Sequence, residues 1–478
     1  MHKLNTVEEL APKYVWKGVD LEKMRTEVDD PSDEAVNDLY KSKSMRHLSK
    51  SLKLMARNDE PVPEDLPEHL KNFIDKNRVV DFSTEDIRMF NRSHQIWKEH
   101  GMKFVFILIF RALPYTYMAE KPANVLHMTK LLEEHTDRRI IETAQFVFDV
   151  MDKNWWEPDK RGILTALKIR IMHSAMRHII QDSTNEQYQW NDAWGKPISQ
   201  EDLIATNQVF SLEFIKGMKM IGQELSREDQ EAWFHTWKRI AEIMGVQKIL
   251  IADRIDEAWD LQVTVYDHLF KDETVAGKPL AVALVQGMHR FKMPERLVLF
   301  FMKTMLKDER FPDCFDRMLS EHYAEKYPDL FKKHDSPEAE EKHKKEVLHK
   351  HAHEDAMQYH KMMRDKKEEI KKQSGDSHEG ILLFILDKIL KLLGIREEKL
   401  HRIEIEFQLL HKILHDVESG KPLEKLEEDS VLELITVFSG IMVSFLSVHF
   451  RDGKYSSTGE KSGFRIPKDL QEDWALKG

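Results

Sequence analysis

A histidine between two arginines is the pattern in this sequence best suited to chemistry. Arg170, His173 and Arg177 fall at i, i+3 and i+7 within residues 161–180, so a helix would place all three on one face. A neutral imidazole is an axial ligand of haem iron, and guanidinium groups bind carboxylates such as the two propionates of a haem. The alternative is a solvated helix face with an exposed histidine, and the spacing alone fits both interpretations.

A second polar group interrupts an apolar pattern one helix earlier in the chain. Arg139, Glu142 and Thr143 share one side of a helix predicted over residues 137–152, whose other side carries apolar residues. This side would form the wall of a pocket opposite His173. Such a wall could hold O2 and orient a substrate through hydrogen bonds.

Helical periodicity runs through most of the chain and predicts an all-α fold. Serines followed three positions later by an acid mark helix starts at Ser83 and Ser199. The strongly apolar residues 102–113 predict a central helix that ends at Pro114. Further helices are predicted over residues 83–101, 203–214, 226–244 and 252–269, and over 277–305 with a break near Pro294. The sequence shows no repeat period and no alternating strand pattern.

Composition narrows the functional classes. The chain has 478 residues, a formal net charge of −11, and only 18 glycines and 16 prolines, which disfavours an all-β or disordered chain. The acidic excess argues against nucleic acid as a partner. Cys314 is the single cysteine, so the chain can form no internal disulfide, thiolate zinc site or iron–sulfur cluster.

Targeting and membrane signals are weak. The first twenty residues lack the apolar core of a signal peptide, so a cytoplasmic location is expected. Of two apolar stretches, residues 104–110 are too short to span a bilayer, and residues 434–450 better suit a buried helix. Peripheral membrane contact is left open, and the sequence does not define the oligomeric state.

The last part of the chain offers a competing metal chemistry. Glu-x-x-His pairs, the spacing found in di-iron helix bundles, occur at Glu340/His343, Glu346/His349 and Glu398/His401. Two of these pairs fall in the charge-dense residues 332–372, which favour a solvated helix or coiled-coil arm over a buried metal core. A di-iron protein and a helical interaction protein are therefore kept as alternatives.

Three motifs, in order, resemble one protein family. The stretches RRIIETAQFV, ALKIRIMHSAMRHII and WGKPISQEDLIATNQVFS are similar to motifs of the MpaB / latex clearing protein (rubber oxygenase) family. The resemblance covers roughly residues 85–310. It implies an all-helical fold, a b-type haem, and cleavage of the carbon–carbon double bonds of isoprenoid chains with O2.

The resemblance also implies roles for single residues. By the match, His173 is the axial ligand of the haem iron. Arg170 and Arg177 support it in cofactor binding. Arg139 and Thr143 match residues on the distal side, where substrate and O2 would react.

Three positions complete or depart from the family pattern. Thr206 matches a further motif threonine that would support the cofactor site. Glu142 stands where latex-cleaving members have a lysine, and their upstream acidic base has no clear counterpart. Carrying the family's spacing over to this chain places that base near Ala123, where there is no acid, and Glu120 could serve as the base instead. The expected substrate is therefore a smaller isoprenoid or lipid rather than rubber.

We expect three regions in the chain. Residues 1–80 would form an N-terminal wrap and connector, residues 81–330 a helical haem-binding oxygenase core, and residues 331–478 a charged arm and C-terminal helical extension. The core would be a haem b-dependent oxygenase that acts with O2 on a small apolar alkene and gives carbonyls. Residues 104–110 and 115–117 would line the substrate channel. The alternative is a non-catalytic haem-binding sensor or carrier.

Overall fold

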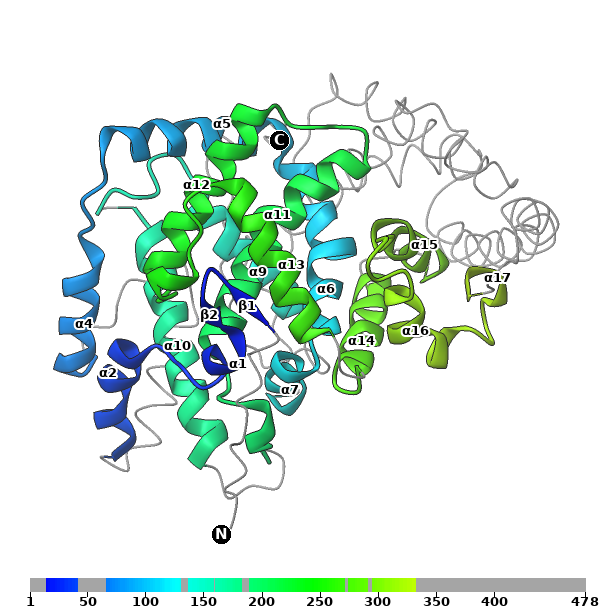
Figure 1. Cartoon of the computed structure of the whole chain (residues 1–478), viewed down its shortest axis with the longest axis horizontal. Helices are drawn as coiled ribbons and strands as arrows, with labels where there is room; N and C mark the ends of the chain where they lie inside the picture. Colours follow the sequence, from blue (N-terminus) through cyan, green and yellow to red (C-terminus); the bar gives the residue numbers. More distant parts are fainter. Residues whose placement is uncertain are drawn as a thin grey trace, which may run out of the picture. The chain divides into compact units, whose positions relative to one another are not determined.

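The chain divides into two compact units. The structure is a computed structural model that describes residues 14–41, 66–129, 136–158, 160–182, 189–270, 274–290 and 295–331. The first unit comprises Met1–Ile96, Arg111–Lys216 and Leu225–Leu284, and the second comprises Trp97–Phe110, Gly217–Glu224 and Val285–Gly478. The all-α prediction is confirmed, because the regular elements of the described ranges are helices apart from one small hairpin (Figure 1).

The first unit begins with that hairpin and a run of short helices. These elements are β1 (Val15–Trp16), β2 (Val19–Asp20), α1 (Leu21–Met24), α2 (Asp30–Lys41) and α4 (Glu68–Arg78). The strands are antiparallel, and the two residues between them, Lys17 and Gly18, have φ of 48° and 82°. Positive φ at both positions gives the tight turn that suits a two-residue hairpin loop. The Asp20 carboxylate then accepts a 3.0 Å hydrogen bond from the Glu22 amide and caps α1.

Helix α10 (Gly162–Asp182) has the most neighbours in the first unit. It packs against α2, α4, α9 and α12. Its side chains Leu167, Ile171 and Ala175 are fully buried, as their helical spacing predicts. Further elements of this unit include α6 (Leu113–Met118), α7 (Glu120–Thr129), α9 (Thr136–Val150), η3 (Asp192–Trp194), α12 (Arg227–Ile243), η4 (Lys248–Leu250) and α13 (Ile255–Leu269).

The two predicted serine helix starts are confirmed. At the start of α5 (Thr84–Ile107), the Asp86 amide donates to the Ser83 Oγ at 3.1 Å, and the Ser83 amide donates to the Asp86 carboxylate at 2.9 Å. Ser199 and Asp202 repeat this exchange, at 3.3 and 2.9 Å, where α11 (Gln200–Met220) begins. Each pair satisfies amides that the first helical turn leaves unpaired.

The predicted helix end at Pro114 is wrong. Helix α5 continues through Gly101, passes into one π-helical turn, η1 (Leu108–Ala112), and is followed directly by α6. Pro114 lies in the first turn of α6. There the missing N–H of proline removes no helical hydrogen bond, so the residue starts a helix instead of ending one.

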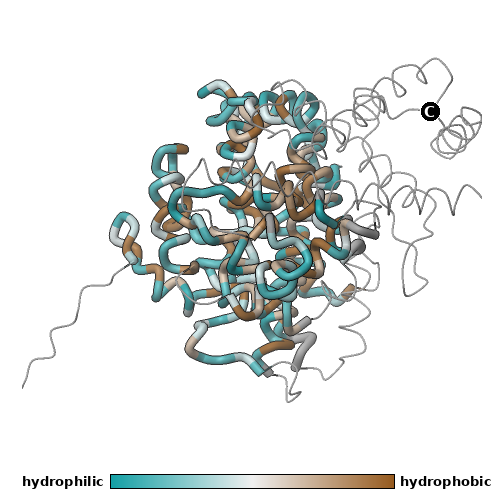
Figure 2. The backbone as a smooth tube through the Cα atoms, turned by 90° about the vertical axis from the view of Figure 1, so that its right-hand side faces the viewer, coloured by the Kyte–Doolittle hydropathy of each residue, from teal (hydrophilic) through white to brown (hydrophobic). Residues whose placement is uncertain are grey.

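The second unit is built from aromatic and aliphatic packing. Its helices include the end of α14 (Gly277–Arg290), α15 (Glu295–Met305), α16 (Cys314–Tyr323) and α17 (Pro328–Phe331). The Phe301 ring lies 5.1 Å from that of Phe106 and 5.3 Å from that of Phe110. Figure 2 shows hydrophobic and hydrophilic residues alternating along the helices.

Several predictions fall on other parts of the chain. The charged arm, the C-terminal helices and the Glu-x-x-His pairs lie outside the described residues. In the part of the chain that the structure describes, no single helix has the length and apolar character needed to cross a bilayer. Within the described ranges, one bent pair of helices, Thr84–Met118 and Glu120–Met128 at 105°, meets those two criteria together.

Candidate functional site

His173 sits near the middle of α10. Its side chain is half-buried, and its Nδ1 is shielded from solvent and has no hydrogen-bond partner. Burial, with smaller contributions from the positive charges of Arg177 and Arg139, lowers the pKa of His173 to about 3. The imidazole is therefore neutral at physiological pH.

Arg139 faces this histidine from the neighbouring helix α9. Its Nη1 donates a 3.0 Å hydrogen bond to the Glu142 carboxylate, and its carbonyl accepts one of 2.9 Å from the Thr143 hydroxyl. The side chains of Arg139 and Glu142 keep 29% and 26% of their exposure, so solvent or a ligand can reach both. The structure therefore brings Arg139, Glu142 and Thr143 together on one side of α9, as predicted.

Tyr117 is a third member of this neighbourhood. It lies on α6 and is fully buried, which raises its pKa, while the charge of Arg139 acts in the opposite direction. Its phenol is thus protonated at physiological pH. The start of α14 also passes very close, since a Cβ on Gly277 would lie 1.8 Å from the Tyr117 carbonyl oxygen. Only glycine fits there.

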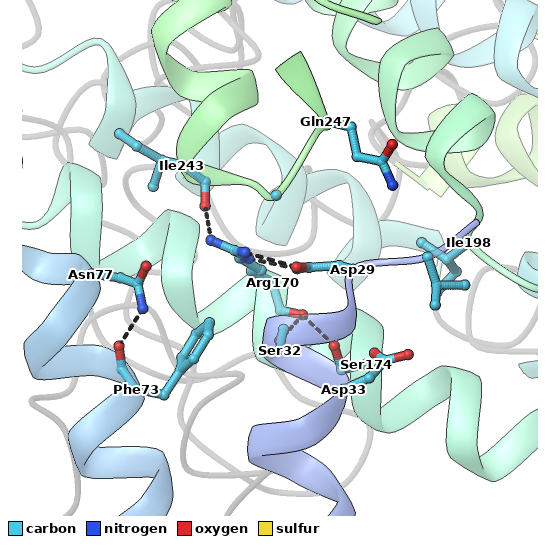
Figure 3. Close-up of polar contacts among 12 residues, drawn as sticks. Asp29, Ser32, Asp33, Phe73, Asn77, Arg170, Ser174, Ile198, Ile243 and Gln247 are labelled. Atoms are coloured by element: carbon cyan, nitrogen blue, oxygen red, sulfur yellow. Dashed lines mark hydrogen bonds and ion pairs between the residues drawn. The ribbon is translucent and has the colours of Figure 1, made fainter. Parts of the chain in front are cut away.

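Arg170 is not a solvated surface residue. It is 8% exposed, and its Nε and Nη2 donate to both oxygens of Asp29, at 2.5 and 2.7 Å (Figure 3). Its Nη1 donates to the Ile243 carbonyl at 3.1 Å, and the guanidinium lies 5.3 Å from the centre of the Phe73 ring. The interpretation of this helix face as solvated is therefore wrong.

Arg177 repeats the arrangement one turn beyond His173. It is 1% exposed, and its Nε donates to the two oxygens of Asp33 at 2.9 and 3.0 Å. Its other nitrogens donate to the Ile198 carbonyl at 3.0 Å and to the Ser174 hydroxyl at 2.8 Å. Both arginines thus bind carboxylates of this chain, and their role at haem propionates stays a prediction.

Glu120 and Thr206 lie in other settings. Glu120 is nearly buried, and its carboxylate accepts hydrogen bonds from the Ala276 amide at 2.8 Å and from the Asn124 side chain at 3.1 Å. These contacts tie α7 to the start of α14, whereas a role as a base stays a prediction. Thr206 lies on α11 with its side chain exposed, and its cofactor role likewise stays a prediction.

The histidine side of this site fits a haem. A buried ring nitrogen without a partner is uncommon in native proteins, and a neutral imidazole is the form that binds a metal. His173 meets both conditions. The site is therefore a half-buried, neutral histidine with a shielded Nδ1, on a central helix and faced by the Arg139 group, in an all-helical protein.

Comparisons with known proteins point to helical oxygenases. Residues 97–316 match the family model described as "ER-bound oxygenase mpaB/B'/Rubber oxygenase, catalytic domain". A rubber oxygenase of Streptomyces sp. (strain K30) is 28% identical over 252 residues, which are 52% of this chain and 56% of the relative. The chain thus spans about half the length of this curated relative. Residues 97–316 are thus similar to the MpaB/rubber oxygenase family, and the resemblance that the motifs predict is confirmed.

A solved structure shows the same fold. The latex clearing protein LCP, in a structure titled as its closed state, aligns with a TM-score of 0.52 at 22% identity. The alignment covers 69% of this chain and 84% of that one. At this identity the likeness extends to the helical fold.

The sequence interpretation missed Asp29 and Asp33 as partners of the site. Both lie in an acidic, loosely patterned N-terminal stretch and contact arginines 141 and 144 positions later in the chain. Their i, i+4 spacing matches a helix face, as does the spacing of Arg170 and Arg177. With 84 acidic and 73 basic residues in the chain, spacing alone could not have paired them.

Proposed function

We propose that this protein is a haem b-dependent oxygenase that acts with O2 on a small apolar alkene, and that His173 would bind the haem iron. The observation that carries the proposal is the half-buried, neutral His173, whose shielded Nδ1 has no hydrogen-bond partner among the described residues. Similarity to the family supports it, since the family model that matches residues 97–316 is described as an oxygenase catalytic domain. When bound, haem iron would supply the redox chemistry that activates O2.

The residues facing His173 would bind and orient the reactants. Arg139 is a cation with accessible surface, and its pairing with Glu142 offsets part of its charge. Thr143 donates to the Arg139 carbonyl, so its oxygen can still accept a hydrogen bond. The protonated Tyr117 hydroxyl is a donor at the same place. These polar groups would position O2 and the double bond, while the surrounding apolar side chains exclude water.

The substrate we propose is an isoprenoid or lipid with an alkene. The Streptomyces relative is named for rubber. In this chain an acid, Glu142, pairs with Arg139 where latex-cleaving members are expected to carry a lysine. That difference in charge supports a substrate other than the polymer, cleaved at C=C to carbonyls.

Absorption of the purified full chain tests the proposal. Protein expressed with haemin should show a Soret band, and His173→Ala should lose it. His235→Ala is a matched control, because the Nε2 of His235 already bonds the Asp86 carboxylate at 2.7 Å, and it should keep the band. A wild-type chain without a Soret band would disprove the cofactor assignment. Oxygen uptake and carbonyl products with squalene, β-carotene or unsaturated fatty acids then test the reaction.

A non-catalytic haem-binding sensor or carrier is the second candidate. It is favoured because both candidate acids are already engaged: Glu142 pairs with Arg139, and Glu120 accepts hydrogen bonds from Ala276 and Asn124. A Soret band without substrate-dependent oxygen uptake would support this candidate over the enzyme.

A further inference from the structure

The N-terminal segment 20–33 is fastened to helix α10 on both sides of His173. Asp29 holds Arg170 through two hydrogen bonds (Figure 3), and Asp33 likewise accepts two hydrogen bonds from Arg177. Between them, the Ser32 hydroxyl donates to the Arg170 carbonyl at 3.3 Å. One short stretch of chain therefore contacts α10 one turn before and one turn after the candidate ligand.

Further contacts hold the two carboxylate–arginine pairs in place. Backbone carbonyls of Ile243 and Ile198 complete the hydrogen bonding of the two arginines. Gly245, with φ of 87°, lies so close that a Cβ there would come within 2.4 Å of Asp29 and 2.7 Å of Arg170. Removing one partner of such a buried pair leaves the other charge unpaired in a poorly solvated place, which is strongly unfavourable.

The two pairs differ in their relation to His173. Arg177 follows His173 by four positions on α10, so the two share a face, and its Nη2 reaches back to the hydroxyl of Ser174, the residue next to His173, at 2.8 Å. Arg170 instead points toward the end of α12 and the Phe73 ring of α4. Asp33 is thus the acid that offsets a cation acting on His173, whereas Asp29 offsets a cation directed elsewhere.

We propose that Asp33 is a positioning residue that, by binding and neutralising Arg177, sets the electron-donor strength of His173 toward the iron. The proposal rests on the proposed function, because it concerns His173 as a haem ligand. Without the Asp33 charge, the uncompensated cation of Arg177 makes the surroundings of His173 more positive. A more positive surrounding favours the reduced iron and weakens the imidazole as a donor.

The experiment compares Asp33→Asn with Asp29→Asn in the haem-loaded full chain. Both variants break a carboxylate–arginine pair between the same segment and the same helix, so both should lower the melting temperature. Only Asp33→Asn should raise the reduction potential of the bound haem, measured by spectroelectrochemical titration. It should also speed haem transfer to apomyoglobin, on the order of tenfold, as loss of an outer partner of a metal ligand does.

Two further variants keep the test decisive. Asp33→Glu retains the charge and should keep the wild-type potential. Arg177→Gln removes the cation and should lower the reduction potential. This variant tests the proposal if Asp33→Asn does not fold. Equal shifts in Asp33→Asn and Asp29→Asn, or no shift in Asp33→Asn and Arg177→Gln, would overturn the role of Asp33 while haem binding stood. A wild-type chain that takes up no haem would overturn both proposals.

Discussion

Asp149 and His173 show how burial acts on an acid and a base of neighbouring helices. Burial raises the pKa of Asp149 to about 6, although Thr165 and Gln145 donate hydrogen bonds of 2.7 and 2.8 Å to its carboxylate. Burial lowers the pKa of His173 to about 3. Both shifts favour the neutral form, because a charge is costly in a poorly solvated place. Asp149 is thus a buried acid that titrates in a physiologically accessible range.

Stability should depend on pH through Asp149. Since its pKa is higher in the folded chain than in the unfolded one, near 3.9, its contribution to stability is present at low pH and is lost as the pH rises through about 6. Asp149→Asn mimics the neutral acid and removes this titration. The fall in unfolding free energy between pH 4.5 and 7.5 should then shrink by about 2 kcal/mol, measured by urea denaturation.

A control separates this effect from surface charge. Asp253→Asn removes a carboxylate that is 85% exposed, and it should leave the pH profile of stability close to that of the wild type. If Asp149→Asn and the wild type showed the same dependence on pH, Asp149 would not be the titrating group.

At the scale of elements, the sequence predicts the helix caps but not how one helix joins the next. The serine caps of α5 and α11 follow from four residues each, because a cap is a contact within one turn. The π-helical turn Leu108–Ala112 has no such local signature, and Pro114 fits either side of a helix boundary. Sequence reasoning therefore located the helices better than the junctions between them.

The turn after α12 is an element that only glycine can supply. Gly245 combines a φ of 87° with contact to the Asp29–Arg170 pair, whereas Gly18 has a φ of 82° and no atom within 4 Å of its would-be Cβ. Gly18→Ala should cost about 1 kcal/mol, for backbone strain alone. Gly245→Ala should cost clearly more in chemical denaturation, since it also displaces the ion pair. If both substitutions lowered the unfolding free energy equally, displacing the Asp29–Arg170 pair would cost no stability.

At the scale of the whole molecule, the candidate site is closed by contacts across the sequence. The motif around His173 was recognisable because its residues are close together in the chain. Its partners Asp29 and Asp33 were not, because pairing between distant charged residues depends on the fold. The site could thus be predicted as a motif, while its surroundings needed the structure.

Segment 20–33 and helix α10 should open as one unit. The two ion pairs join the segment to α10, and amides of Lys196 and Gln200, which donate to the Arg25 and Glu27 carbonyls at 2.7 and 2.9 Å, also join it to the start of α11. Hydrogen exchange measured by mass spectrometry should show peptides over 20–33 protected as long as those over α10. Asp29→Asn should reduce protection in both. Exchange of 20–33 within seconds beside a protected α10 would contradict this coupling.

The pairing of Asp29 with Arg170 also bears on how the protein is made. During synthesis at about 5–20 residues per second, Asp29 leaves the ribosome on the order of ten seconds or more before its partner, which is 141 positions later. Until then its carboxylate stays in water, and the central helix cannot be enclosed. Contacts of such sequence separation form late. The nascent chain would therefore keep the surroundings of His173 accessible until α10 has emerged, which leaves an interval for cofactor loading before the N-terminal segment docks.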